Sequence, residues 1–304
     1  MKALVTGATG LVGRALVARL DAPNALGRDV ARARATLGPA VTVFSWQPAS
    51  EPAPSQAFDG VEVVFHLAGE SVAGGRWTAE QKRRIKDSRV LGTRNLVATL
   101  RARPSPPRLL VSVSAVGYYG DRGDTELDEH AGKGEGFLAD VCEEWEAEAR
   151  QAEQSNTRVV ILRLGLVFAA KGGALERMLT PFRLGVGGKL GSGRQWMPWV
   201  HIDDAVGLLL HAAEGHTSTP IVNAVSPRAV TNAEFTRSLG RALGRPTFMP
   251  VPSPLLRVAL GEMSTALLDS QRVVPRAALG SGYSFAYPEL DRALAACLKP
   301  DKKA

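Results

Sequence analysis

The sequence of 304 residues predicts an α/β protein built on a doubly wound parallel sheet. Short apolar runs alternate with segments of helical periodicity through the first half of the chain. The run Val61–Leu67 is almost wholly apolar, as expected of a strand that is covered on both faces. The first run, Lys2–Thr6, leads through a glycine turn directly into a helix, which is how a strand–helix–strand unit begins.

The N-terminal elements follow from periodicity and from turn residues. Apolar residues fall on one face of a helix over Leu11–Leu20. Val41–Trp46 is a clear strand, and the segment 48–56 behind it is rich in proline and serine and predicts a loop. Together with Val61–Leu67, these segments predict the first half of the sheet.

The middle of the chain continues the alternation. Thr78 has the spacing of a capping box with the glutamine three residues later, and it begins a helix that reaches Arg101, where a proline-rich segment stops it. Strands are predicted over Leu109–Val113 and Arg158–Leu164, with a helix of strongly acidic face over Phe137–Gln151 between them.

The pattern changes after residue 165. Five glycines fall within Gly185–Gly193, followed by a helix over Asp204–Ala213, a short strand over Ile221–Val225 and a capped helix over Thr231–Leu243. We therefore expect one sheet domain and one smaller α/β lobe. The sheet domain is expected to comprise residues 1–165 with 199–225 folded back onto it, the lobe residues 166–198 and 226–299, and a tail residues 300–304.

Composition excludes several classes of protein. Hydrophobic residues make up 45% of the chain, too many for a disordered polymer. Two cysteines, Cys142 and Cys297, cannot form a disulfide framework, and neither stands in a CxxC pair, so a zinc ribbon is excluded. The histidines show no ligand-like spacing, and we expect no metal.

Charge and hydropathy limit the classes of partner that the protein can have. The net charge is +7, from 37 Lys and Arg against 30 Asp and Glu, but the basic residues are scattered, so we expect no nucleic-acid partner. A mildly basic surface suits a phosphorylated cofactor instead. The chain shows neither a signal-peptide pattern nor an apolar run near the ~20 residues of a membrane span. We expect a cytoplasmic protein with no membrane partner.

The turn Gly7–Gly13 has the pattern GxxGxxG between a strand and a helix. Gly7 allows a sharp turn, Gly10 lets the backbone approach a pyrophosphate, and Gly13 lets the helix pack close to the strand. The helix N-terminus adds unpaired N–H groups and a partial positive charge. The alternative is an ordinary tight turn. The residues expected to contact a dinucleotide here are Gly7, Thr9, Gly10, Leu11, Val12 and Gly13.

The end of the second predicted strand bears on the choice of cofactor. Enzymes that use NAD place an acidic residue there, whereas Arg28 occupies this place with further arginines behind it. A guanidinium suits the 2′-phosphate of NADP, so we expect NADP rather than NAD. Asp29 could bind a ribose instead, or cap the helix that follows.

Several segments together resemble the extended short-chain dehydrogenases, the NAD-dependent epimerase/dehydratase family. The closer resemblance is to an uncharacterised epimerase-like branch with its own short C-terminal domain, and it covers essentially the whole chain. The segments that carry it are Gly7–Gly13, Val63–Gly69, Gly92–Leu96, Ser112–Ser114 before Tyr118–Gly120, Gly188–Gln195 before Trp199–Asp204, and Leu268–Pro288.

The resemblance implies a Rossmann core with a substrate lobe from the second half of the chain. It implies that Leu67, Ala68 and Gly69 line the nicotinamide ribose or the pyrophosphate. Arg89 would be a further cofactor contact, or else a solvated helix residue. Members of the family often dimerise through helices that correspond to the predicted helices at 78–101 and 137–151, so a homodimer is one expected arrangement.

The chain departs from the family pattern at the catalytic pair. The family uses a Tyr and a Lys four residues later, with a Ser; the ammonium lowers the phenol pKa and the phenolate moves a proton. Ser114 is present, but Phe137 and Val141 occupy the Tyr and Lys positions, and no Tyr-x-x-x-Lys occurs anywhere. Another group must handle the proton, or the protein does not perform this reaction.

Substitutes lie in the loops. Tyr119, after Ser114, could handle the proton or could be a packing aromatic. Glu70 could act as a base near the substrate or be a solvated carboxylate. His201 could be a general acid, although we favour a structural histidine with Asp203 or Asp204 capping the next helix. The expected substrate contacts are Glu70, Arg194, Gln195 and Trp196.

Two functions from different classes fit this sequence. The first is an NADP-binding oxidoreductase or epimerase-like protein of the short-chain dehydrogenase superfamily, which acts on a small molecule, with nucleotide sugars among the candidates, through an atypical site. The second is a catalytically silent NADP(H)-binding protein that senses redox state or docks a partner. A flavin or nucleotide-sugar binder without nicotinamide is a third, because fold does not fix function.

Overall fold

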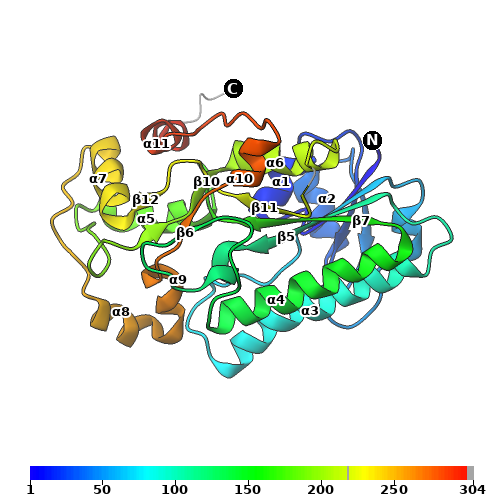
Figure 1. Cartoon of the computed structure of the whole chain (residues 1–304). Coiled ribbons are helices and arrows are strands. Elements are labelled where there is room, and N and C mark those ends of the chain that lie inside the picture. Colours follow the sequence, from blue (N-terminus) through cyan, green and yellow to red (C-terminus); the bar gives the residue numbers. More distant parts are fainter. Residues whose placement is uncertain (218, 300–304) are drawn as a thin grey trace.

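The computed structural model describes residues 1–217 and 219–299, and within them seven strands form one sheet (Figure 1). Its order is β11-β7-β5-β4-β1-β2-β3, and every neighbouring pair is parallel. The predicted doubly wound Rossmann-like sheet is therefore confirmed. Its strands are β1 (Ala3–Thr6), β2 (Asn24–Gly27), β3 (Thr42–Ser45), β4 (Val63–His66), β5 (Leu109–Ala115), β7 (Arg158–Leu164) and β11 (Ile221–Ala224).

Successive side chains of each strand point to opposite faces of the sheet, so the buried core forms two layers, one on each face. Leu4, Val64 and Leu110 stand side by side on one face and pack against α3 (Ala79–Arg101), with α4 (Phe137–Arg150) beside it. Val5 and Phe65 point the other way, towards the layer that holds α1 (Leu11–Val17), α2 (Val30–Leu37) and α6 (Ile202–Ala213). Figure 1 shows the helices in layers above and below the sheet.

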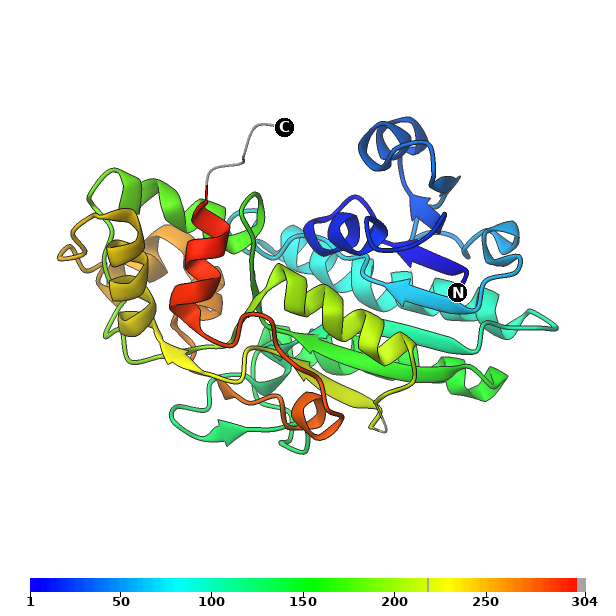
Figure 2. The same cartoon turned by 90° about the horizontal axis from the view of Figure 1, so that it is seen from above.

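The second half of the chain builds a lobe at one end of the sheet (Figure 2). Its core gathers Phe168, Trp199 and Phe235, the first two stacked with ring centroids 5.7 Å apart. The lobe and its connections contain β8 (Leu166–Phe168), β9 (Trp196–Met197), β10 (Trp199–His201), β12 (Val230–Thr231), α5 (Gly173–Arg183), α7 (Asn232–Leu243), α8 (Ser253–Leu260), the 3-10 turn η4 (Gly261–Ser264), α9 (Thr265–Leu268) and α11 (Leu290–Leu298).

The C-terminal segment crosses back over the sheet domain. Its strand β13 (Arg272–Val273) pairs with β6 (Glu126–Leu127), and α10 (Arg276–Gly280) packs against β11. The buried carboxylate of Asp204 on α6 accepts the backbone N–H groups of Ala286 at 2.7 Å and Tyr287 at 2.9 Å. The chain then returns to the lobe as α11. These contacts tie one continuous segment to both parts of the molecule.

The helices and strands that the structure describes differ from those expected from the sequence mainly in where each one begins or ends. The helix expected to reach Leu20 ends at Val17. The segment 199–225, expected to fold back, supplies β10, α6 and the edge strand β11; the division into two domains stays a proposal, and the expected tail 300–304 lies outside the described residues. Among those residues no helix is long and apolar enough to cross a membrane.

The tight packing at Gly13 gives the first testable prediction. A Cβ atom at Gly13 would lie 2.2 Å from the Gly7 carbonyl oxygen, so the turn must shift to admit it. We expect Gly13→Ala to lower the free energy of unfolding by about 1–3 kcal/mol, the usual cost of overpacking, in urea denaturation. The matched control is Gly280→Ala, which meets no atom within 4 Å and should leave stability unchanged or slightly raised. Equal effects of the two changes would contradict this account.

Candidate functional site

The glycine turn exposes backbone at the carboxyl end of β1. Gly7 has φ +65°, and a Cβ there would lie 2.6 Å from the Leu67 carbonyl oxygen. Gly10 is the N-cap of α1 without a side-chain cap, so the first N–H groups of the helix have no side-chain acceptor. Thr9 and Gly10 are exposed, whereas Leu11 is half-buried. The turn has the form that a dinucleotide phosphate requires.

Positive charge gathers beyond the end of β2. Arg28 and Arg32 are exposed, and within the described part of the chain no carboxylate forms an ion pair with either. The Asp29 side chain accepts the N–H of Arg32 at 2.9 Å and caps α2. Of the two roles expected for Asp29, the structure therefore displays the cap. The arginines stay available to an anionic ligand.

A buried histidine organises the end of β4. The Thr6 hydroxyl oxygen accepts the N–H groups of Leu67 and Ala68, each at 3.1 Å. Its own proton therefore goes to Nδ1 of His66, 2.7 Å away, and Nε2 of His66 donates to Thr93 at 2.8 Å. Burial lowers the pKa of His66 to about 4, so the ring is neutral at physiological pH. This chain of contacts fixes the backbone of Leu67 and Ala68, two expected cofactor contacts.

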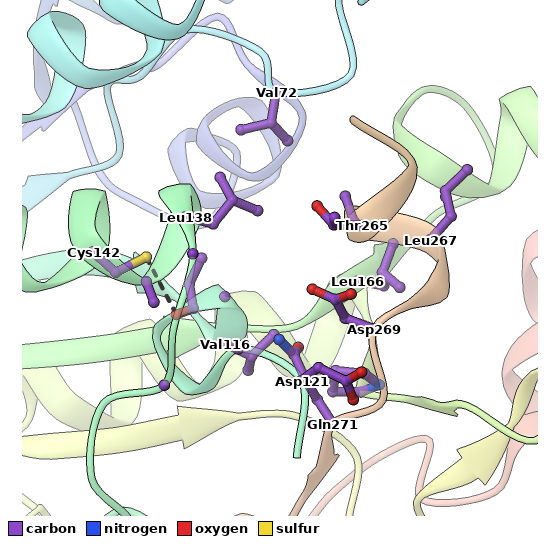
Figure 3. Close-up of a pocket in the computed structure, with 18 of the residues that line it drawn as sticks. Val72, Val116, Asp121, Leu138, Cys142, Leu166, Thr265, Leu267, Asp269 and Gln271 are labelled. Atoms are coloured by element: carbon purple, nitrogen blue, oxygen red, sulfur yellow. Dashed lines mark hydrogen bonds between the residues drawn. The ribbon is translucent and has the colours of Figure 1, made fainter. Parts of the chain in front are cut away.

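A cavity of about 840 Å³ lies between the carboxyl ends of the central strands and the C-terminal lobe (Figure 3). The sheet side is lined by the loop after β5, the first turn of α4 and the end of β7. Among the described residues, the lobe supplies Leu166, Val167, Met178, Leu190, Trp196, Met197, Pro198, Asn232, Glu262, Thr265, Ala266, Leu267, Asp269 and Gln271.

Two expected contact residues line this cavity, Arg89 and Trp196. The Arg89 guanidinium donates to the backbone oxygens of Glu70 at 2.9 Å and Ile85 at 3.1 Å, and it lies over the Trp145 ring. Burial lowers its pKa. Gly69 is held so closely beneath it that a Cβ there would lie 3.1 Å from the guanidinium carbon. Arg89 is thus a packed part of the wall, not a solvated helix residue.

The other expected substrate contacts lie outside the cavity lining. Arg194 is exposed, and Glu70 stands beside the wall with its backbone bonded to Ser88 and Arg89. Gln195 is buried and donates to the backbone oxygens of Leu190 and Leu267 at 3.1 and 3.2 Å. Gln195 therefore anchors the glycine loop to the C-terminal segment.

Ser114 and Tyr119 lie behind the wall in one buried network. The Ser114 hydroxyl donates to Glu146 at 2.8 Å, and Arg163 holds both carboxylate oxygens of Glu146 at 2.8 and 2.9 Å. Arg163 also donates to the Tyr119 hydroxyl, which donates to Asn223 at 2.8 Å. Burial raises the pKa of Tyr119 to about 12, against the opposing charge of Arg163. Neither residue lines the cavity.

The residues at the family's Tyr and Lys positions do line the cavity. Phe137 packs edge-on against Trp77 with ring centroids 5.4 Å apart, and Lys82 lies 4.7 Å from the Phe137 ring centroid. Val141 and the neighbouring Cys142 complete this stretch of wall. Burial raises the pKa of the Cys142 thiol to about 11, so it is not a thiolate at neutral pH. This wall offers no group that exchanges a proton near pH 7.

The sequence did not indicate a pair of carboxyl groups where the loop after β5 meets the lobe. Asp121 follows η2 (Val116–Tyr119) and Asp269 follows α9, and both line the cavity, as Figure 3 shows. Burial, with the neighbouring charge of Asp121, raises the pKa of Asp269 to about 6. Asp121 could have been found from its place directly after a strand-end loop. No motif in the last sixty residues marks Asp269.

The expectation for His201 was wrong in one detail. His201 is structural, but it caps α6 itself, because its ring nitrogen accepts the N–H of Asp203 at 3.2 Å. Asp203 forms an exposed ion pair with Arg19, and Asp204 binds the C-terminal segment, so neither caps the helix. The described residues contain no group of three or more His, Cys, Asp or Glu placed to hold a metal ion.

The comparisons with known proteins agree with this geometry. The model of the NAD dependent epimerase/dehydratase family matches residues 3–224, and a domain of unknown function, DUF1731, matches residues 251–297. The epimerase family protein SDR39U1 of Mus musculus is 39% identical over 298 residues, which is 97% of this chain and 98% of its own. Protein Mb2239 of Mycobacterium bovis, also of the epimerase family, is 40% identical over 293 residues, 95% of each chain.

A solved structure of a protein from this family is similar over nearly its full length. The crystal structure of human epimerase family protein SDR39U1 (isoform 2) with NADPH has a TM-score of 0.87 and 36% identity, and the match covers 98% of this chain and 99% of that one. Together with the family matches, it confirms the resemblance expected from the sequence, including the short C-terminal domain.

The buried ion pair supports a prediction on stability. Glu146 and Arg163 are each only 2% exposed, so Glu146→Gln leaves a buried guanidinium without its counter-charge. We expect a loss of about 3 kcal/mol in the free energy of unfolding, measured in urea. Glu148→Gln on the same helix is the control, because its partner Arg94 is 57% exposed, and it should cost under about 1 kcal/mol. Similar losses for both variants would contradict the role given to the buried pair.

The buried His66 should make the free energy of unfolding depend on pH. The unfolded state takes up a proton near pH 6.5, whereas the folded state resists it until about pH 4, so stability falls as the pH drops through this window. We expect His66 to account for a loss of about 2–3 kcal/mol between neutral pH and about pH 4.5. Urea denaturation of His66→Gln should show a flatter pH profile than the unaltered chain. The exposed His130→Gln should keep the original slope; parallel profiles for all three would refute the assignment.

Proposed function

The chain belongs to the NAD-dependent epimerase/dehydratase family, and we propose that it is an NADP(H)-dependent oxidoreductase or epimerase-like enzyme acting on a small molecule in the 840 Å³ cavity. One observation carries the proposal: the glycine turn after β1 and the cavity beyond β5 and β7 lie at the carboxyl ends of parallel strands of the same sheet. Ligands of open α/β sheets bind along that edge.

The residues of the turn fit a dinucleotide. Gly7, Gly10 and Gly13 leave no side chain over the exposed helix N-terminus, and Cβ atoms at Gly7 and Gly13 would strike backbone. Arg28, with Arg32 behind it, is placed for an adenosine 2′-phosphate, which favours NADP over NAD. The presence of NADPH in the human relative's structure supports this choice. Leu67, Ala68, Gly69 and Arg89 would contact the nicotinamide half.

The chemistry divides between cofactor and protein. When bound, NADPH would supply a hydride. Phe137 and Val141 provide an apolar wall that excludes water, and Arg89 provides a fixed positive charge beside it. Ser114 and Tyr119 act in this proposal as positioning residues, because their hydroxyls hold the loop after β5 through Glu146 and Arg163. Trp196 is the proposed substrate contact within the lining, and roles for Glu70, Arg194 and Gln195 stay predictions.

A silent NADP(H)-binding protein is the second candidate. The sequence contains no Tyr-x-x-x-Lys, and the wall where that pair belongs is apolar. NADPH oxidation with a panel of aldehydes and ketones separates the candidates, because tight cofactor binding without turnover of any carbonyl favours the silent protein.

Two further expectations from the sequence stay predictions. They are dimerisation through α3 and α4 and a cytoplasmic location.

Cofactor preference is the first test of the proposal. We expect NADPH to bind at least about tenfold more tightly than NADH, a difference of about 1.4 kcal/mol for one charged contact. Arg28→Ala should abolish that preference in a fluorescence titration. Arg34→Ala removes the same charge from an exposed position on the adjoining helix α2 and serves as the control. If neither nucleotide binds, or if Arg34→Ala acts as strongly as Arg28→Ala, the proposed cofactor site is wrong.

A further inference from the structure

The lobe side of the cavity carries negative charge and no positive charge. Among the described residues that the C-terminal lobe contributes to the lining there are two carboxylates, Glu262 and Asp269, and no Lys or Arg. The lobe side of the cavity is therefore negative although the net charge of the whole chain is +7. Anionic groups of a ligand, such as a diphosphate, would find no cationic partner among the described residues on this side.

The two carboxyl groups at Asp121 and Asp269 are not neutralised. Asp121 is held in place because its Oδ1 accepts the N–H groups of Gly123 at 3.2 Å and Ser270 at 3.1 Å. The half-buried Asp269 carboxylate receives no hydrogen bond and no ion pair from the described part of the chain. Its raised pKa has two causes, burial and the Asp121 charge, and no cation among them. The exposed Asp121 and the half-buried Asp269 therefore form a negative site at the cavity that has no ion-pair partner among the described residues.

The positive groups of the lining have other hydrogen-bond partners than these two aspartates, and Lys133 is the one of them that the described residues pair with carboxylates. Lys133 is paired with Asp140 at 2.7 Å and Glu143 at 3.0 Å. The Arg89 guanidinium is bonded to backbone oxygens on the opposite wall, and Arg122 donates to the backbone oxygen of Gly132 at 3.3 Å. Glu262 already has Lys82 as its partner at 2.8 Å. Of the carboxylates in the lining, Asp121, Asp269 and the exposed Glu135 have no cationic partner among the described residues. Asp121 and Asp269 lie close to each other, where the loop after β5 meets the lobe.

The rest of the lining is largely apolar. Figure 3 shows Val72 and Leu138 on one side of the cavity and Leu166 and Leu267 near the two aspartates. Burying a charged group in such surroundings is costly unless an opposite charge meets it. A ligand that combines an apolar body with one positive charge satisfies both parts of the lining.

We propose that this cavity binds an apolar organic cation, such as a protonated amine, held between Asp121 and Asp269, rather than a nucleotide sugar. The inference rests on the proposed function only in calling this ligand the substrate, because the binding site is formed by the chain alone. It replaces the nucleotide sugars considered from the sequence with a substrate class of opposite charge.

Three probes of one skeleton test the proposal. Phenethylammonium, phenethyl alcohol and hydrocinnamate differ chiefly in charge, and UDP-glucose represents the nucleotide sugars. Saturation-transfer NMR titrations of the full chain should show the cation binding at least about tenfold more tightly than the alcohol at about pH 7.5, and the anion more weakly still. Affinity for the cation should fall several-fold towards about pH 5, because Asp269 becomes protonated there and loses its charge.

Two variants locate the binding. Asp269→Asn and Asp121→Asn should each reduce the preference for the cation to a few-fold or less, and Asp269→Asn should also remove its pH dependence. The amide oxygen that Asp121→Asn introduces can still accept the backbone N–H groups, so this second variant keeps the loop intact should Asp269→Asn fold poorly. Glu153→Gln, an exposed carboxylate on η3 (Gln151–Ser155) away from the cavity lining, is the matched control for one lost charge.

The outcomes are separable from those of the proposed function. Tighter binding of hydrocinnamate or UDP-glucose than of phenethylammonium would overturn the inference, as would a preference that survives both aspartate variants or a failure of all probes to bind. NADPH is titrated into the same samples. Cation binding without NADPH binding upholds the site and rejects the proposed enzyme, whereas NADPH binding without cation preference rejects the inference alone.

Discussion

The buried ion pair of Glu146 and Arg163 is the interaction on which the rest of the site depends. It joins α4 to β7 through two short contacts and, through Ser114 and Tyr119, reaches β5 and the loop behind it. The first turn of α4 and that loop form the sheet side of the cavity. Removing a buried charge from its partner is expensive, so the pair specifies one arrangement of these elements.

This constraint also explains why the two hydroxyls expected to be catalytic do not face the cavity. Ser114 and Tyr119 are donors that the Glu146 carboxylate and Asn223 require, and their burial leaves them no exposed surface for a ligand. The cavity wall that they support carries Phe137 and Val141 in place of a phenol and an ammonium. Carboxyl groups line the cavity instead at Asp121, in the loop after β5, and at Asp269, in the lobe. The acidic groups of the pocket are thus found where that loop meets the lobe.

The sequence predicted those features that depend on local patterns. The glycine turn, the parallel strands and the long helices follow from glycine spacing and from periodicity, and the structure has them. The cap at His201 was missed because an aspartate is the commoner N-cap. Here the Asp204 carboxylate instead accepts the backbone N–H groups of Ala286 and Tyr287, which lie more than eighty residues away in the chain. Gln195 and Asp269 depend on tertiary contacts between the glycine loop and the C-terminal segment. No periodicity or motif encodes such contacts.

The C-terminal segment has a consequence for how this architecture can change. Two family models divide the sequence at about residues 224–251, yet the segment beyond that division pairs with β6, packs on β11, binds Asp204 and contributes Asp269 and Gln271 to the cavity. Neither part encloses a complete pocket by itself. The two sequence modules must therefore be inherited as a unit, and a chimera that exchanges one without the other would join two halves of different binding sites.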